Sequence, residues 1–339
     1  VAYVDPPYNT GTDVGAFSYA NRQGDDAWVF FMRERLEALL PLLSEDGVVI
    51  LTIDDHMMAH LKLLCDDVFG RTNFLACLPV RIKPGGRSND SYIAVEHEYI
   101  LLYAKNAGSV NICLWPEREE NLRAYKLSDD RGTYKLRDVL RTGGHSTPEE
   151  RPNSVYAVRY HRETHAMETS MSLKEFMIEH HHEQVTEEIV QLWMEWCQSE
   201  FTIEGWQTVF PYDSTDSLRV WRYTRPSFGE LVDSGMLEVG SRGRTIGKPM
   251  IKIKDYAKDG VLPTSMWVDE RYNATQYGTK LLKSIIQHDG FSYPKSIHAV
   301  EDALRLVVDH DKDAWVLDMF GGSGTTLHAV ISMNKEDKA

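Results

Sequence analysis

The hydrophobic positions of the first hundred residues follow two different spacings. Apolar side chains recur every three or four positions from Trp28 to Leu43 and from Met57 to Phe69, which predicts two helices. Residues 48–53 and 99–103 are continuous apolar runs, typical of strands that are buried on both faces of a sheet. Strands that alternate with helices predict an α/β fold of parallel strands joined by crossover helices.

The pattern changes between residues 107 and 270, where this alternation fades and Trp, Glu and His become frequent. Some elements can still be predicted in and after this region: helices at residues 173–177, 185–196, 279–287 and 299–308, and a strand with one cationic face at residues 249–254. A chain of 339 residues is long enough for two domains. We therefore expect the middle region to be a domain of its own.

The first apolar run ends abruptly in Asp5-Pro6-Pro7-Tyr8. A strand that stops there presents a carboxylate, a proline carbonyl and an aromatic ring at its carboxyl end, the edge of an open α/β sheet where ligands bind. The two prolines stiffen the turn and leave its carbonyls free to accept hydrogen bonds. Such a group can hold a planar ring with an amino substituent, whose hydrogens reach Asp5 and the Pro6 carbonyl while Tyr8 stacks on the ring. A plain proline turn after an edge strand fits the motif equally well.

A second motif lies near the other end of the chain, where the apolar residues 315–317 lead into Asp318-Met319-Phe320-Gly321-Gly322-Ser323-Gly324-Thr325-Thr326. Gly322 and Gly324 allow a ligand close to the backbone, and a helix that begins at the two threonines offers N–H donors. Leu327 stands where a dinucleotide-binding loop has its third glycine, and no lysine follows as in a phosphate-binding loop. The loop therefore suits an uncharged nucleoside with an amino-acid tail, such as S-adenosylmethionine.

Together, the two motifs resemble those of amino-directed DNA methyltransferases, which modify N6 of adenine or N4 of cytosine. Their order, Asp-Pro-Pro-Tyr first and Phe-x-Gly-x-Gly last, resembles the β arrangement of that superfamily. Within residues 1–106 and 275–339, further stretches resemble the modification subunits of type III restriction systems: Asp5–Gly11, Gly47–Asp55, Ala59–Leu64, Glu98–Asn106 and Phe291–Ser296. The middle of the chain shows no such resemblance.

This resemblance implies a Rossmann-like α/β fold of S-adenosylmethionine-dependent methyltransferases, with permuted motif order and an inserted α+β target-recognition domain. The catalytic half would span residues 1–106, the target-recognition domain residues 107–270, and the cofactor-binding half residues 271–339. The implied activity is methyl transfer from S-adenosylmethionine to N6 of adenine in duplex DNA, with the base flipped out. The implied partners are duplex DNA, a restriction subunit with helicase and nuclease activity, and a second copy of the chain; no metal ion is expected.

The resemblance also assigns residue roles. Asp5 and the Pro6 carbonyl would accept the two amine hydrogens, and Tyr8 would stack on the flipped base. The catalytic residues would be Asp5, Pro6, Pro7 and Tyr8. The cofactor-binding residues would be Asp5, Phe291, Pro294, Lys295, Asp318, Phe320, Gly322, Gly324 and Thr325. Adenine is favoured as the target because the tetrad begins with Asp5, whereas members that act on cytosine more often carry Ser there.

Charge is distributed unevenly along a chain whose formal net charge is −14, a value that argues against a general nucleic-acid binder. Between Glu163 and Glu204 ten glutamates face a single lysine, whereas residues 240–258 contain six Lys and Arg and one Asp. A local basic face can bind phosphates whatever the total charge, although a solvated surface is the plainer interpretation. A cationic, Gly-rich loop at residues 81–92 is a further candidate. The expected DNA-binding residues are Arg81, Lys83, Arg87, Arg242, Arg244, Lys248 and Lys252.

Other features of the sequence concern the setting of the protein. The cysteines, Cys65, Cys77, Cys113 and Cys197, are widely spaced and predict free thiols in a reducing cytoplasm. We see no signal-peptide pattern and no apolar stretch of the ~20 residues that a membrane span needs, so we expect a cytoplasmic protein. Both ends look cut, so we expect the chain to be part of a longer protein.

Three alternatives stay open on the sequence alone. The chain could methylate N4 of cytosine, bind DNA as a non-catalytic specificity subunit of a restriction complex, or methylate RNA. Cofactor binding separates the second alternative from an enzyme, and a preference for duplex DNA over RNA excludes the third.

Overall fold

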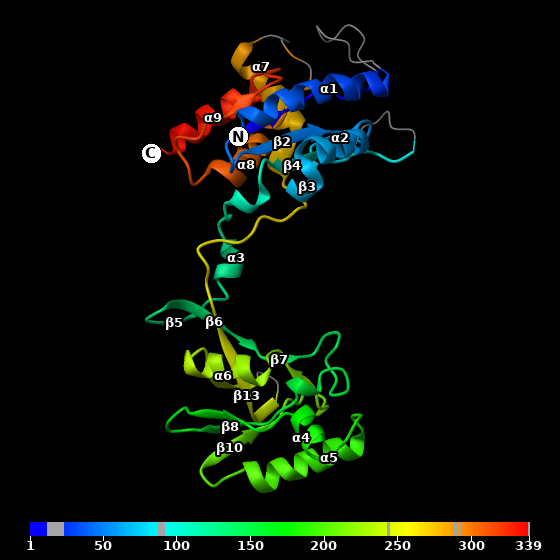
Figure 1. The fold of residues 1–339 in the computed structure, drawn as a ribbon. Helices are drawn as coiled ribbons and strands as arrows, with labels where there is room; N and C mark the ends of the chain where they lie inside the picture. The colour runs from blue at the N-terminus through cyan, green and yellow to red at the C-terminus, as the bar shows by residue number, and fades with distance from the viewer. Residues whose placement is uncertain (12–23, 87–91, 243–244, 288–290, 292, 338–339) are drawn as a thin grey trace. The chain divides into compact units, whose positions relative to one another are not determined.

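The computed structural model describes residues 1–11, 24–86, 92–242, 245–287, 291 and 293–337, without the side chains of residues 241–249. The chain divides into two compact units: unit 1 consists of Val1–Pro116 and Asp259–Ala339, and unit 2 of Glu117–Lys258 (Figure 1). The bounds predicted for the middle domain, residues 107–270, are wider than unit 2. Trp115 and Trp267 lie inside those predicted bounds but pack against each other in unit 1, with ring centroids 5.4 Å apart.

Unit 1 is built on a five-stranded sheet with the order β14-β1-β2-β4-β3. The strands are β1 (Ala2–Val4), β2 (Val48–Ile53), β3 (Phe74–Arg81), β4 (His97–Ala104) and β14 (Leu317–Asp318). β1 pairs in parallel with both β2 and β14, and Tyr3 stands opposite Asp318. Segments from opposite ends of the sequence therefore contribute adjacent strands.

The expectation that the strands are all parallel is wrong for β4, which pairs antiparallel with β2 and β3. No described helix lies between β3 and β4, and a connection without a crossover helix returns the chain antiparallel to the preceding strand. The sequence pattern also misses β3 itself. Most of its side chains are only half-buried and Pro79 interrupts it, as is common in a strand at the edge of a sheet.

Helices cover both faces of this sheet. They are α1 (Asp25–Leu39), α2 (Met58–Cys65), α7 (Leu281–Ile286), α8 (Ile297–Val308) and α9 (Thr325–Glu336), with the short helices η1 (Leu40–Leu42), η2 (Asp66–Gly70), η3 (Arg71–Asn73), η4 (Ala107–Ser109), η7 (Glu270–Tyr272) and η8 (Thr275–Lys280). Trp28 of α1 and Leu61 of α2 pack with Leu51 on one face. Leu304 of α8 packs with Ile50 on the other. Alternate residues of β2 thus enter two separate cores, which is why its apolar run is unbroken.

Unit 2 combines antiparallel strands with helices. One sheet has the order β12 (Leu237–Arg242), β13 (Thr245–Tyr256), β6 (Gly132–Asp138) and β5 (Leu127–Asp129); a second has β10 (Trp206–Val209), β8 (Val158–His161) and β9 (Met167–Thr169); and β11 (Val220–Trp221) pairs with β7 (Leu140–Arg141). The helices are α3 (Glu119–Leu122), α4 (Leu173–Glu179), α5 (Glu187–Trp196) and α6 (Arg225–Asp233), with η5 (Pro152–Ser154) and η6 (Cys197–Phe201). Most of these strands are too short for a two-residue period to stand out, and the sequence pattern misses them.

Several predicted elements of both units are confirmed. The helices expected at residues 173–177, 185–196, 279–287 and 299–308 are α4, α5, α7 and α8, and the strand expected at residues 249–254 lies within β13. All four cysteines are free, as predicted.

In the part of the chain that the structure describes, no helix is both long and apolar enough to cross a membrane, and no group of His, Cys, Asp and Glu could hold a metal ion.

Candidate active site

The two sequence motifs meet at one edge of the unit 1 sheet. Because β1 and β14 run in parallel with Tyr3 opposite Asp318, the segments that follow them leave the sheet at the same edge. Asp5 continues β1 at this edge, and the Gly-rich loop continues β14. The carboxyl ends of parallel strands are where open α/β sheets bind ligands.

Asp5 is held by two neighbours. Its Oδ1 accepts a hydrogen bond from Thr52 Oγ1 at 2.5 Å and lies 3.2 Å from Lys295 Nζ. Burial raises the pKa of Asp5, and the opposing effects of Lys295 and Thr52 reduce that rise without cancelling it. Among the described residues, no partner contacts Oδ2, so one carboxylate oxygen remains free to accept from a ligand.

Lys295 joins the residues of this edge. Its Nζ donates to Tyr8 Oη at 2.6 Å and to Glu98 Oε2 at 2.9 Å, in addition to its contact with Asp5. Burial alone would lower the pKa of Lys295, but the nearby carboxylates of Asp5 and Glu98 outweigh burial and raise it. The side chain is therefore a buried ammonium at neutral pH, placed between two carboxylates.

The Tyr8 ring is fixed from two sides. Its hydroxyl donates to Glu98 Oε2 at 3.0 Å, and Lys295 Nζ lies 4.3 Å from the ring centroid. Burial, together with the charges of Glu98 and Asp5, raises the pKa of Tyr8 well above its usual value, so the side chain stays a neutral phenol. A ring with a fixed position is what a stacking surface for a planar ligand needs.

The proline turn has one occupied carbonyl and one that is free. Trp28 Nε1, fully buried in α1, donates to the Pro7 carbonyl at 2.7 Å. No donor in the described segments reaches the Pro6 carbonyl. The turn is therefore anchored through Pro7, while Pro6 can accept a hydrogen from a ligand.

The Gly-rich loop is shaped by its own backbone. Phe320 N donates to Asp318 Oδ1 at 3.0 Å, and the hydroxyls of Ser323 and Thr325 lie 2.7 Å apart. Gly324 has φ +77° at the N-cap of α9, where no described side chain caps the helix. The first-turn N–H groups of α9 are thus available to a ligand.

Two glycines allow the remaining cofactor-binding candidates to pack closely against neighbouring backbone. Gly322 has φ +49°, and a Cβ there would approach the Phe291 ring to 3.3 Å, so this ring lies against the Gly-rich loop. A Cβ on Gly278 would come within 2.5 Å of the Pro294 carbonyl and 2.8 Å of the Lys295 carbonyl. Gly278, which belongs to no sequence motif, lets residues 294–295 pass close to η8.

Thr52 and Glu98 carry no motif in the sequence, yet both contact the Asp-Pro-Pro-Tyr tetrad. Thr52 carries the only hydroxyl in β2, a strand buried at every position. Glu98 is the acidic residue near the start of β4, which is otherwise mainly apolar. A polar side chain in a buried strand is a usable signal, but it does not identify the partner.

The expected DNA-binding residues of unit 1 do not all point to solvent. Arg81 closes β3, and its Nη2 donates to the Val268 carbonyl at 2.6 Å while its Nε is buried without a partner. Lys83 is exposed, as a phosphate contact requires. Arg87 lies outside the described residues.

The expected DNA-binding residues of unit 2 are only partly described. Lys252 of β13 forms an ion pair with Asp138 of β6. Arg242 lies at the end of β12 and Lys248 within β13, but their side chains lie outside the described part, as does all of Arg244. The structure therefore brings the catalytic and cofactor candidates together in unit 1 and leaves the basic stretch at residues 240–258 within unit 2.

Comparisons with known proteins agree with both motifs. Residues 1–336 match the sequence model of a family described as DNA methylase. The chain is 28% identical to the type III restriction-modification enzyme EcoPI Mod subunit of Escherichia phage P1, over 99% of this chain and 52% of that protein. It is 25% identical to the type II methyltransferase M.KpnI of Klebsiella pneumoniae, over 99% of this chain and 72% of that protein. It is 42% identical to a probable type III HindVI Mod subunit of Haemophilus influenzae, over 31% of this chain and 14% of that protein. The chain thus spans about half the length of the EcoPI subunit.

Proposed function

The chain belongs to the DNA methylase family, and on that premise we propose that it transfers a methyl group from S-adenosylmethionine to N6 of adenine in duplex DNA. The observation that carries this proposal is the parallel pairing of β1 with β14, which places Asp5 and the Gly-rich loop at one sheet edge. Curated relatives over nearly the whole chain are named Mod subunits and a methyltransferase of restriction-modification systems, which supports a role in such a system.

The Gly-rich loop fits S-adenosylmethionine. Gly322 leaves space beside the Phe291 ring, and the uncapped N-terminus of α9 offers backbone donors to the amino-acid part of the cofactor. When bound, S-adenosylmethionine supplies a methyl group activated by its sulfonium. The residues that would hold it are Phe291, Pro294, Asp318, Phe320, Gly322, Gly324 and Thr325.

Asp5 and the Pro6 carbonyl would orient the amine of the target base. Thr52 and Lys295 occupy Oδ1 of Asp5, so Oδ2 is left to accept one amine hydrogen, and the Pro6 carbonyl accepts the other. Two fixed acceptors direct the nitrogen lone pair away from the base plane and stabilise the positive charge that develops as the new bond forms. The Tyr8 ring would stack on the flipped base.

We assign Lys295 and Glu98 positioning roles rather than contact with the cofactor. Lys295 offsets one of the two negative charges of Asp5 and Glu98, and together with Glu98 it holds the Tyr8 hydroxyl. This differs from the cofactor-binding role that the family resemblance implies for Lys295. A buried ammonium with three partners at hydrogen-bond distance has little freedom to turn toward a further ligand.

The finer parts of the proposal concern fold, target domain and partners. We propose a methyltransferase fold with permuted motif order, supported by the position of β14 beside β1. Unit 2, with its basic stretch at residues 240–258, is proposed as the target-recognition domain. A restriction subunit is the proposed protein partner, because several relatives are named type III Mod subunits, and a second copy of the chain is proposed as a further one.

The test is a methylation assay with S-adenosylmethionine and mixed-sequence duplex DNA, in which digested nucleosides are identified by mass spectrometry. N6-methyladenine is the expected product. N4-methylcytosine would keep the mechanism and overturn the choice of base. Neither product, with DNA still bound, would overturn the proposal in favour of a non-catalytic specificity subunit.

A further inference from the structure

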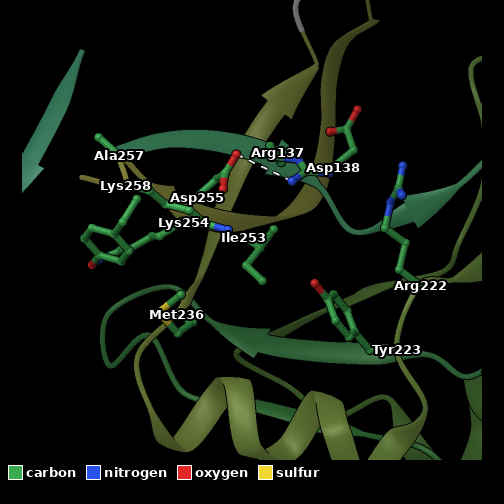
Figure 2. Close-up of a pocket in the computed structure, with 11 residues that line it drawn as sticks. Arg137, Asp138, Arg222, Tyr223, Met236, Ile253, Lys254, Asp255, Ala257 and Lys258 are labelled. Atoms are coloured by element: carbon green, nitrogen blue, oxygen red, sulfur yellow. Dashed lines mark ion pairs between the residues drawn. The ribbon is translucent and has the colours of Figure 1, made fainter. Parts of the chain in front are cut away.

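Unit 2 contains a hollow of about 330 Å³ between the residues that follow β11 and the strands β6 and β13 (Figure 2). Its apolar lining comes from Tyr223, Met236 and Ile253, and its cations include Arg137, Arg222 and Lys258. The residues of the proposed active site all lie in unit 1, so this hollow is a separate feature.

The backbone around the hollow is fixed by hydrogen bonds. Arg222 N donates to the Val139 carbonyl at 2.8 Å, and the Tyr223 carbonyl accepts from Tyr156 Oη at 2.9 Å. With both backbones anchored, Figure 2 shows the side chains of Arg222 and Tyr223 rising from one segment toward the strands. An anchored backbone reduces the entropy that these side chains lose on contact with a ligand.

Positive charge in the hollow is only partly neutralised. Asp255 is shared between Arg137 at 3.5 Å and Lys135 at 3.7 Å, and the Arg137 side chain is 56% exposed. Neither Arg222 nor Lys258, both exposed, has an ion pair with any residue that the structure describes. The hollow therefore offers an excess of cations to an anionic ligand.

The other acidic groups nearby do not change this balance. Asp138, which also lines the hollow, is paired with Lys252. Lys254 directs its ammonium to Asp129 at 3.0 Å and Glu238 at 3.3 Å. The surplus negative charge around Lys254 balances the surplus cation at Asp255, so the uncompensated charge is that of Arg222 and Lys258.

The distribution of charge over the rest of unit 2 also favours an anionic ligand at the hollow. Residues 163–204 carry ten glutamates and one lysine, whereas the rest of unit 2 carries nineteen Lys and Arg against fourteen Asp and Glu. The hollow lies entirely in this second, basic part. A polyanion is therefore attracted to the part with the hollow and repelled by the part with α4 and α5.

We propose that this hollow binds one nucleotide unit of duplex DNA, with Arg222, Arg137 and Lys258 on phosphodiester oxygens and the Tyr223 side chain against the adjoining sugar. Arginine forks match phosphate geometry, and tyrosine is among the side chains that contact the phosphates and sugars of duplex DNA. An acidic peptide would use the cations but not the ring. The inference rests on the proposed function, because it takes duplex DNA to be the substrate.

The test compares two double variants of the whole protein. R222Q/K258Q removes two cations from the hollow. The matched control R162Q/K174Q also removes two cations, one directly before and one inside the acidic residues 163–204. Affinity for a fluorescent duplex is measured at several salt concentrations. We expect R222Q/K258Q to lose about tenfold in affinity at low salt and to reduce the slope of log K against log salt by about two, since each lost phosphate contact reduces it by about one. The control should change neither quantity.

Further readouts separate the failure of this inference from that of the proposed function. Y223L should weaken DNA binding a few-fold without changing the salt slope, and the control variant R162Q/K174Q should methylate DNA at the wild-type rate. An unchanged salt slope in R222Q/K258Q overturns the inference even when methylation is normal. A protein that binds DNA through the hollow but forms no methylated base overturns the proposed function alone. A wild-type protein that binds an acidic peptide and no duplex overturns both.

Discussion

At the sheet edge of unit 1, one ammonium lies 2.9 Å and 3.2 Å from two carboxylates, and the side chains of Lys295 and Glu98 are 14% and 12% exposed. In the hollow of unit 2, the Arg137 side chain is 56% exposed and shares a single carboxylate with Lys135. Ions of the first kind have lost most of their water and depend on their partners for stability. Ions of the second kind keep their water and remain available to a ligand.

This difference in burial predicts different effects of substitution at the sheet edge of unit 1 and in the hollow of unit 2. Removing one partner of a buried ion pair leaves an uncompensated charge and costs about 3–5 kcal/mol, whereas an exposed pair contributes about 0–1 kcal/mol. Salt screens exposed charges over a distance of about 10 Å but reaches buried ones much less. Substitutions at the sheet edge should therefore change the methylation rate, and substitutions in unit 2 should change DNA affinity and its salt dependence.

The largest expected effect is that of Asp5→Ala. The variant loses the acceptor for an amine hydrogen, so we expect the rate of methyl transfer to fall by about 10²–10³-fold, with DNA affinity within a few-fold of the wild type. Single-turnover methylation and duplex binding measure the two quantities. Asp67→Ala, which removes an exposed carboxylate paired with Arg33, is the control. More than a tenth of the wild-type activity in Asp5→Ala would refute the assigned role.

Lys295→Met should change the pH dependence of the same reaction. Asp5 must be ionised to accept the amine hydrogen, so activity is lost as the pH falls through the pKa of Asp5. Burial raises that pKa and Lys295 opposes the rise. Without the ammonium the pKa of Asp5 rises further, so the acid limb of the pH–rate profile moves to higher pH by about one to three units. Lys295→Arg keeps the charge and should restore the wild-type limb. If Lys295→Met and the wild type share one acid limb, Lys295 does not act through Asp5.

Two glycine substitutions, one in each unit, test how tightly the surrounding residues pack around the glycine. Gly278→Ala places a Cβ 2.5 Å from the Pro294 carbonyl, and overpacking of this kind costs about 1–3 kcal/mol. Gly229→Ala, in α6 of unit 2, meets nothing within 4 Å and should stabilise its helix by about 1 kcal/mol. Thermal unfolding should show a lower midpoint for the first variant and an equal or higher one for the second. The opposite order would mean that residues 294–295 can move away from η8 without loss.

The smallest expected effect on the reaction itself is that of neutralising Arg242, Arg244 and Lys248 together. We expect weaker duplex binding and a flatter salt dependence, with the methylation rate at saturating DNA unchanged. Binding at several salt concentrations is the measurement. A salt slope equal to that of the wild type would remove this stretch from the DNA interface.

The Asp-Pro-Pro-Tyr tetrad and the Gly-rich loop could be predicted as candidate site segments because each is a run of consecutive residues whose chemistry is evident locally. Thr52 and Glu98 could not, because they meet Asp5 and Tyr8 only when β1, β2 and β4 lie side by side. That order depends on the antiparallel return of β4 between β2 and β3, which no local pattern encodes. Long elements with a clear period, such as α8, were predicted well, whereas the short strands of unit 2 were not.

The pairing of β1 with β14 also has a consequence for the time course of synthesis. Ribosomes add about 5–20 residues per second, so the residues between Val4 and Leu317 take roughly 15 seconds to a minute to appear after β1. Throughout that interval, the nascent chain carries the Asp-Pro-Pro-Tyr tetrad without the loop that lies beside it in the finished fold. The two motifs can act together only once translation has passed β14. A chain interrupted before that point has the Asp-Pro-Pro-Tyr tetrad but lacks the Gly-rich loop, so it cannot form the complete site.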